Sequence, residues 1–219
     1  MSEFERSTIN RVRRVPDRGK YDKETIYSIV DDALVCHVAF VQDGRPFVIP
    51  TLHARRDDEI LLHGATTSRL IRHVAAGNEL CLAITHVDGI VLARSVFHHS
   101  INYRAAVLFG CGYLVEGDKK NMAALQQFTE RLLPGRWSDA RQPNQKELKA
   151  TSVVAIPIES ASAKIRTGPP VDDEEDYMLP VWAGILPLVQ SFGIPEADGR
   201  LADDIIVPEY LARYVASRS

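Results

Sequence analysis

Hydrophobic and polar residues alternate along several short stretches of the chain. The alternation over residues 34–40 predicts a strand with one buried face. Asp43-Gly44 supplies the positive φ of a tight hairpin, which leads into a return strand over residues 47–53. A second hairpin is expected at Asp88-Gly89. The further strands predicted in this way cover residues 59–63, 80–85, 90–97, 103–115 and 152–158.

Three segments follow the helical period instead. Asp22 is a suitable cap for a helix that carries Ile26, Ile29 and Val30. A short helix from Leu70 is closed by a glycine at position 77, and a third helix covers residues 122–132. Six or seven strands joined mostly by hairpins indicate a closed antiparallel barrel. No G-x-G-x-x-G follows the first strand, which argues against a Rossmann fold.

The composition changes after residue 160. Gly168-Pro169-Pro170 and the acidic run 172–176 do not fit a packed strand. Residues 179–187 are apolar but broken by prolines, so we expect them to pack on the body or on a partner subunit. We therefore divide the chain into a barrel domain over residues 11–160 and a C-terminal extension over residues 161–219.

Bulk properties narrow the class of protein. The 219 residues are 45% hydrophobic and 25% charged, with a net charge of −3, which is typical of a globular protein and argues against general nucleic-acid binding. No apolar run is long enough to span a membrane. Cys36, Cys81 and Cys111 are odd in number and lie in strand-like runs, so we expect reduced thiols and a cytoplasmic protein.

The stretch from Leu61 to Leu70 carries the most specific chemistry. A strand ends at His63, then Gly64 and three hydroxyl residues precede Arg69 and the start of a helix. Hydroxyls such as those of Thr67 and Ser68, free backbone N–H groups and a cation together favour a phosphate site, and hence a nucleotide cofactor. The alternative is an ordinary helix cap with Arg69 in solvent.

Two other segments offer groups to the same ligand. Asn102-Tyr103-Arg104 places a second arginine beside an amide, although a surface ion pair would explain Arg104 equally. Pro50-Thr51-Leu52-His53 interrupts its strand with a proline, so unpaired backbone groups there could meet the edge of a heteroaromatic ring. A plain edge strand is the alternative.

The histidines do not predict a metal site. None shows the H-x-x-x-H or C-x-x-C spacing of a metal centre, and His98 and His99 would point to opposite faces of a strand. His63 is the exception of interest because it precedes the phosphate turn and could contact a cofactor ring. No G-x-S-x-G is present, so the sequence names no catalytic residue.

An ordered series of short motifs runs through residues 11–187, and it resembles the pyridoxamine 5′-phosphate oxidase-related, FMN-binding split-barrel family. The similarity is greatest to its branch of flavin-nucleotide-binding and nitroimidazole-resistance proteins. The motifs are Arg18-Gly19-Lys20-Tyr21-Asp22, Gly44-Arg45-Pro46-Phe47-Val48-Ile49-Pro50-Thr51, Leu62-His63-Gly64-Ala65, Ser68-Arg69-Leu70, Asn102-Tyr103-Arg104, Phe109-Gly110, Pro134-Gly135-Arg136-Trp137, Lys164-Ile165-Arg166-Thr167-Gly168-Pro169-Pro170 and Val181-Trp182-Ala183-Gly184.

The resemblance implies a mainly β fold with peripheral helices, a six-stranded antiparallel split β-barrel, and a homodimer with FMN at its interface. It assigns the phosphate to Ser68, Arg69 and Arg104. The backbone of residues 50–52 would meet the isoalloxazine edge, and His63 would lie beside the flavin. Since the Trp182 segment is apolar and irregular, we also expect it to act as a lid from the partner subunit.

Two departures bear on the reaction. Leu70 stands where pyridoxamine phosphate oxidases carry a lysine, and residues 208–219 lack their arginine- and histidine-bearing substrate segment. We therefore expect no oxidation of pyridoxamine phosphate. The leading hypothesis is an FMN-dependent oxidoreductase acting on a small molecule. The alternatives are a flavin-storing or flavin-sensing protein, FAD in place of FMN, and a barrel that binds haem or a deazaflavin.

Overall fold

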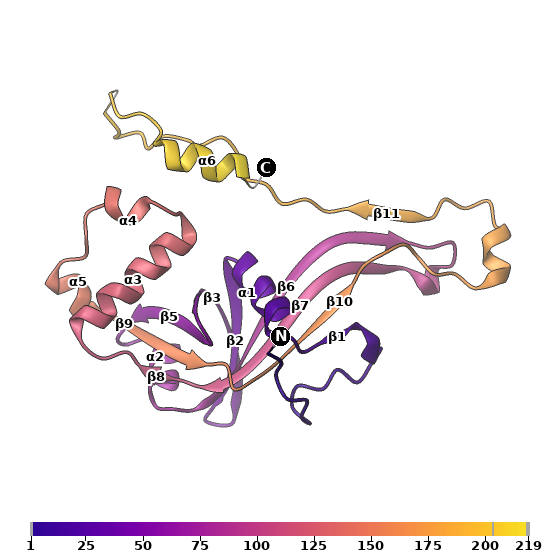
Figure 1. The fold of residues 1–219 in the computed structure, drawn as a ribbon, viewed down its shortest axis with the longest axis horizontal. Coiled ribbons are helices and arrows are strands. Elements are labelled where there is room, and N and C mark those ends of the chain that lie inside the picture. Colours follow the sequence, from indigo (N-terminus) through magenta and orange to yellow (C-terminus); the bar gives the residue numbers. More distant parts are fainter. Residues whose placement is uncertain (1, 203, 218–219) are drawn as a thin grey trace.

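Two antiparallel sheets form the body of the protein, and helices pack around them (Figure 1). The computed structural model describes residues 2–202 and 204–217. Within these residues the strands are β1 (Gly19–Lys20), β2 (Val35–Gln42), β3 (Arg45–Leu52), β4 (Ala54–Arg56), β5 (Glu59–Ala65), β6 (Glu79–Leu92), β7 (Ser100–Cys111), β8 (Tyr113–Leu114), β9 (Thr151–Pro157), β10 (Ser160–Arg166) and β11 (Gly184–Pro187).

The helices lie between these strands and at the C-terminal end. The α-helices are α1 (Lys23–Asp32), α2 (Arg69–Ala75), α3 (Asp118–Leu132), α4 (Arg136–Asp139), α5 (Gln145–Ala150) and α6 (Glu209–Ser217). Short 3₁₀ turns are η1 (Pro16–Arg18), η2 (Val96–His98) and η3 (Glu174–Met178). In the described part of the chain, no helix combines the length and the hydrophobicity needed to cross a bilayer.

The sheet topology is that of a split barrel. The larger sheet has the order β1-β10-β7-β6-β2-β3, with β11 added on β6, and the smaller sheet has the order β4-β5-β9-β8. The predicted split β-barrel is confirmed. Full closure is not observed, because the strands divide into two sheets with separate edges.

Close packing where the chain passes between the sheets depends on glycine. A side chain at Gly110 would place its β-carbon 2.1 Å from the carbonyl oxygen of Pro157. Gly110 is therefore required by the approach of two backbones rather than by an unusual φ. The bend predicted near this position coincides with the end of β7 and the start of β8.

Local signals place several elements as predicted. Asp22 caps α1, since its carboxylate accepts a hydrogen bond of 2.8 Å from the backbone N–H of Thr25. Asp43 and Gly44 have positive φ and join β2 to β3 in a hairpin. The hairpin predicted at Asp88-Gly89 is wrong: β6 continues through a bulge there, because β7 pairs with it on both sides of the irregularity.

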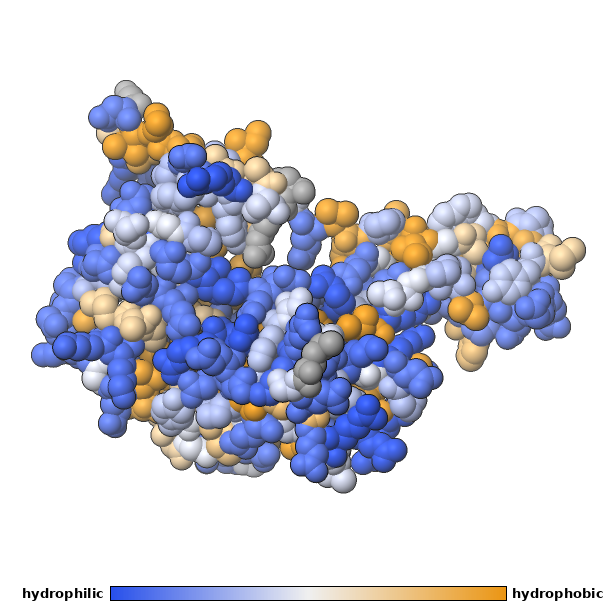
Figure 2. Space-filling model, in the orientation of Figure 1, coloured by the Kyte–Doolittle hydropathy of each residue, from blue (hydrophilic) through white to orange (hydrophobic). Residues whose placement is uncertain are grey.

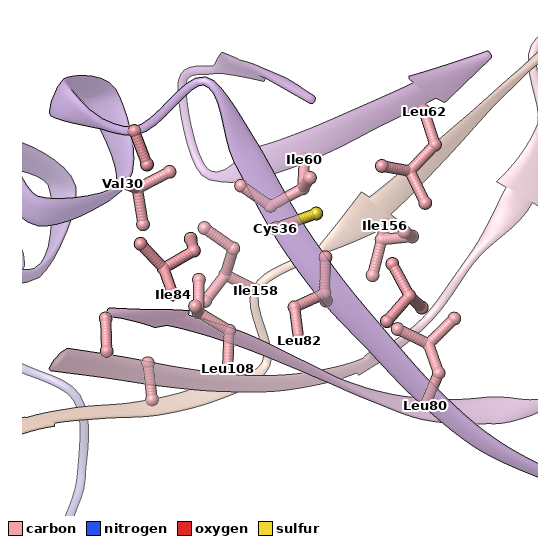
Figure 3. Packing of buried hydrophobic residues seen from close by; sticks show 14 of the residues in the cluster. Val30, Cys36, Ile60, Leu62, Leu80, Leu82, Ile84, Leu108, Ile156 and Ile158 are labelled. Atoms are coloured by element: carbon pink, nitrogen blue, oxygen red, sulfur yellow. The ribbon is translucent and has the colours of Figure 1, made fainter. Parts of the chain in front are cut away.

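The main hydrophobic core lies between the two sheets and beneath α1 (Figure 3). Leu82 and Leu108 from the larger sheet meet Ile60 and Ile156 from the smaller one, and all four are almost fully buried. Cys36 is buried among them and its thiol is unpaired, as expected. Burial raises the pKa of the Cys36 thiol to about 12, so this cysteine is not an activated nucleophile.

The C-terminal part divides into a strand within the sheet and an extended segment outside it. β10 lies between β1 and β7, so the larger sheet includes residues up to Arg166. Beyond it, β11 pairs with the distal part of β6, and α6 contacts α4 through Tyr210 and Arg136. Figure 2 shows hydrophobic residues gathered along this segment, while the adjacent body is mostly hydrophilic in that view.

Candidate functional site

The predicted phosphate turn lies between β5 and α2. Its backbone is held by hydrogen bonds from the N–H of Ser68 to Ala65 (2.8 Å) and from the N–H of Thr66 to Ala150 (3.3 Å). Gly64 faces α2, where a β-carbon would lie 3.1 Å from a side-chain carbon of Ile71. The glycine therefore lets α2 pack directly against β5, which fixes the position of the turn.

The polar side chains of the turn are not used by the fold. The Ser68 side chain makes no cap hydrogen bond to α2, which disfavours the ordinary helix-cap interpretation. Arg69 has no carboxylate partner among the described residues, and its guanidinium lies 4.2 Å from the ring centre of Phe47. Because α2 is only seven residues long, an anion here would be held chiefly by side chains.

The turn adjoins the free edge of β3. Phe47 belongs to β3, which ends the larger sheet and pairs only with β2 among the described strands, so its outer edge is unpaired there. Pro50, Thr51 and Leu52 lie on this edge, and the hydroxyl of Thr51 has only a 3.4 Å contact to the carbonyl of Leu52. β3 is therefore an edge strand, and the edge lies beside a surface cation. The predicted contact of its backbone with a cofactor ring stays a prediction.

Arg104 lies elsewhere on the sheet. In the strand register Arg104 lies opposite His86 of β6. Next to Phe47 on β3, the register runs across β2 and reaches β6 at Cys81. The five-residue offset corresponds to about 17 Å along the strand. Within one subunit the structure does not bring Arg104 to the turn, so it can reach a ligand there only from a second copy of the chain.

Two carboxylates occupy Arg104. Its guanidinium donates to Asp88 (3.0 and 3.1 Å) and to Asp32 (2.9 Å). These hydrogen bonds, with that of Asp88 the strongest, raise the pKa of Arg104. The surface ion-pair interpretation describes this arginine correctly.

Asn102 and Tyr103 do not join the turn either. Asn102 is buried, and its amide donates to the carbonyl of Gly168 (3.2 Å) and accepts from Arg166. Tyr103 pairs with Arg166 in the strand register and is half-buried. These residues organise the end of β10.

His63 points to the opposite side of β5 from the turn. Its ring packs edge-on against Phe128 of α3, with ring centres 4.5 Å apart. Its Nδ1 is buried without a hydrogen-bond partner, and burial lowers the pKa of the ring. His63 is thus a neutral imidazole in a partly apolar site, and neither nitrogen is used by the described residues.

Trp182 is 68% exposed and lies against the backbone of Gly184 at the start of β11. Since β11 pairs with the distal part of β6, the segment extends away from the turn of its own subunit. Its predicted role as a lid requires a partner.

One group of ligand-type atoms lies near this segment. His98, Asp173 and Asp176 gather within 4.8 Å on the exposed surface, and a 3.2 Å contact joins His98 to Asp173. The sequence prediction missed it because the acidic run lies far from His98 in the chain. The contact is that of a surface ion pair.

Sequence reasoning also missed two contributors. Phe47 supports Arg69, and Arg166 is a buried cation at the opposite edge of the sheet. Both residues lie in motifs that carry the resemblance to the split-barrel family, and these motifs were the only sequence signal for them. Neither motif indicated which partners the fold would bring to them.

The fold and the turn define a split-barrel protein, and the comparisons agree. A family model described as pyridoxamine 5′-phosphate oxidase matches residues 22–165. The chain belongs to this family. No curated protein sequence matches it significantly.

Solved structures similar to the chain include two that match over nearly their full length. The flavocytochrome Anf3 from Azotobacter vinelandii is 36% identical, covering 94% of this chain and 96% of its own, with a TM-score of 0.90. The FAD and heme binding protein from Mycobacterium smegmatis is 33% identical, covering 90% and 97%, with a TM-score of 0.86.

A candidate 5-nitroimidazole antibiotic resistance protein from Bacteroides thetaiotaomicron is similar in fold. It is 21% identical, covering 66% of this chain and 84% of its own, with a TM-score of 0.56.

Proposed function

We propose that the chain is a flavocytochrome, a homodimeric oxidoreductase that binds FAD and haem. The observation that carries this proposal is the similarity, at 36% and 33% identity over nearly whole chains, to a flavocytochrome and to an FAD and heme binding protein. FAD is preferred to the FMN expected from the sequence because the second of these proteins is described as binding FAD.

The residues of the turn fit a flavin phosphate. Ser68 offers a hydroxyl that caps no helix, and Arg69 offers a guanidinium with no carboxylate partner among the described residues. The unpaired edge of β3 beside them supplies N–H and C=O groups for the polar edge of a ring. In this proposal Ser68 and Arg69 anchor the phosphate and β3 orients the ring.

In this proposal His63 would hold the haem iron. A neutral imidazole with a free nitrogen and an apolar neighbour is what a haem ligand requires, and His63 meets these conditions beneath α3. Four other histidines use a ring nitrogen in a hydrogen bond or a short polar contact: His53, His86, His98 and His99. His73 also has a ring nitrogen, Nε2, without a partner among the described residues, but it is more deeply buried, against Phe40 in the main core; His37 is exposed.

The two cofactors together support an electron-transfer function. When bound, a flavin exchanges two electrons and a haem iron exchanges one. The protein's own groups would hold each cofactor on a different side of β5. The small-molecule substrate expected from the sequence remains part of this proposal, without a residue assigned to it.

Exposed apolar surface supports the homodimer. The outer face of the larger sheet carries Val41 and Val48, each 62% exposed, together with Val35. The C-terminal segment exposes further large side chains. Its most exposed members are Met178, Val189, Ile194 and Ile206. A monomer rarely leaves this much apolar surface in water, so we propose that a second copy covers it.

The absorption spectrum of the purified protein is the direct test. We expect both flavin bands near 450 nm and a Soret band near 400 nm, and release of FAD on denaturation, identified by chromatography. A spectrum without flavin bands would refute the flavin part of the proposal. Flavin bands without a Soret band, after expression with added haem precursor, would refute the haem part.

The ligand assignment is tested separately. His63→Gly should lose the Soret band, and added imidazole should restore it by filling the vacated position. His37→Ala is the matched control, because His37 is exposed and should leave the spectrum unchanged. Retention of the full Soret band in His63→Gly would exclude His63 as the ligand.

Reduction of the bound cofactors tests the oxidoreductase function. Anaerobic addition of NADH or NADPH should bleach the flavin bands and then sharpen the haem bands of the reduced iron. If neither donor reduces the haem, although dithionite added directly does, the oxidoreductase part of the proposal is refuted.

A further inference from the structure

A small cavity lies at the edge of the larger sheet opposite β3. The short strand β1 pairs there with β10, with Gly19 opposite Lys164. The cavity has a volume of about 340 Å³. Its lining includes Arg18, Lys20 and Arg166 but only one carboxylate, that of the exposed Asp17.

Arg166 is the unusual member of this group. It is only 7% exposed, and no carboxylate pairs with it among the described residues. Its guanidinium donates to neutral acceptors: the side chain of Asn102 and the carbonyls of Gly168 (3.2 Å) and Pro169 (3.3 Å). Its Nε has no hydrogen-bond partner in the described part of the chain. A buried charge with only neutral partners is costly, and an anion nearby would reduce that cost.

The neighbouring cations increase the positive potential. Neither Arg18 nor Lys20 has an ion-pair partner in the described residues. Burial lowers the pKa of Arg166, and the nearby charge of Arg18 lowers it further. Holding the turn after β10 explains the hydrogen bonds of Arg166. It does not explain why two further cations line the same cavity.

We propose that this cavity binds a small organic phosphate. The three cations would hold the anionic group, and Ile165, Pro169 and Val171 form an apolar wall for its body. Within one subunit the cavity is separate from the phosphate turn, because β1 and β3 are the two outer strands of the sheet. The inference therefore goes beyond the proposed flavin and haem sites.

Titration of the flavin-loaded protein with phenyl phosphate tests the site, followed by calorimetry or by ³¹P NMR. Saturable binding is expected, and it should be tighter than that of inorganic phosphate because of the apolar wall. The double variant Arg18→Gln/Lys20→Gln removes two cations while Arg166 and its hydrogen bonds stay in place. It should bind phenyl phosphate about tenfold more weakly or worse.

The control variant Lys149→Gln/Arg200→Gln removes the same charge from exposed positions outside the cavity, and its affinity should equal that of the wild type. Absence of saturable binding by the wild type would overturn the proposal. So would equal weakening in the two double variants, or weakening in Arg69→Ala instead. The visible spectrum of each variant reports the cofactors, so failure of the proposed function would be seen separately.

Discussion

Replacing Arg69 by alanine tests the proposed phosphate turn most directly. The side chain is exposed, is paired with no carboxylate in the described structure, and lies over Phe47. Removing it should therefore leave the fold unchanged while the turn loses its only cation. Circular dichroism and a urea melt should match those of the wild type.

The magnitude follows from the contacts that are exchanged. A charge-assisted hydrogen bond contributes about 1.5–3 kcal/mol, and stacking on an exposed ring about 0.5–1 kcal/mol. When Arg69 turns to the ligand it gives up part of its stacking on Phe47, which offsets part of the hydrogen bond. We therefore expect Arg69→Ala to lose about 1–2.5 kcal/mol of binding free energy. This corresponds to roughly a 5- to 70-fold increase in the dissociation constant of FAD.

The assay is a fluorescence titration of the cofactor-free protein with FAD, in 0.15 M salt. Arg72→Ala is the matched control, since Arg72 is exposed one helical turn further along α2 and carries the same charge. Its effect should be smaller than that of Arg69→Ala, because Arg72 lies one helical turn further from the hydroxyl groups of the phosphate turn. An Arg69→Ala variant that binds FAD as tightly as the wild type would refute the reasoning. Equal weakening by both variants would indicate a general field rather than a site.

Three further predictions address other features. Arg104→Ala should leave the dissociation constant of FAD within about twofold of the wild type, because Asp32 and Asp88 occupy this arginine in the described structure, and a loss as large as that of Arg69→Ala would contradict this assignment. Gly110→Ala should lower the free energy of unfolding in urea by about 1–3 kcal/mol or more, because its β-carbon would meet a carbonyl oxygen, whereas Gly193→Ala, in open space, should have no effect. Burial lowers the pKa of His53. His53 therefore takes up a proton more readily in the unfolded protein than in the folded one, so the free energy of unfolding should fall as the pH is lowered from about 7 to 5. His53→Gln should reduce this pH dependence, and an unchanged pH profile would exclude His53 as its cause.

Short-range patterns predicted much of the secondary structure. The cap at Asp22 and the hairpin at Asp43-Gly44 depend on atoms a few residues apart, and both are confirmed. Asp88-Gly89 shows the limit of such patterns. The same dipeptide can form a turn or a bulge, and here β11 lies so close to Gly89 that a β-carbon would come within 2.9 Å of the Leu186 carbonyl. That neighbour is about 100 residues away in the chain.

The same limit applies to the candidate site. The hydroxyls and the arginine of the turn are adjacent in sequence, so they were recognisable as a group. Arg104 was assigned to the same anion by position in a motif series, yet Asp32 and Asp88 occupy it. Nothing in the residues around Arg104 indicates Asp32, because that contact depends on how α1 lies across the larger sheet.

The sequence alone determined the alternating strands, the capped helix and the chemistry of the turn after β5, because backbone sterics and local hydrogen bonds act over a few residues. Tertiary structure alone decided which side chains remain unpaired. Within the described residues it left Arg69 without a carboxylate and gave Arg104 two, turned His63 away from Ser68, and brought Arg18 beside Arg166. Charge pairing and burial depend on distances between segments far apart in the chain, and only the packing of the two sheets sets those distances.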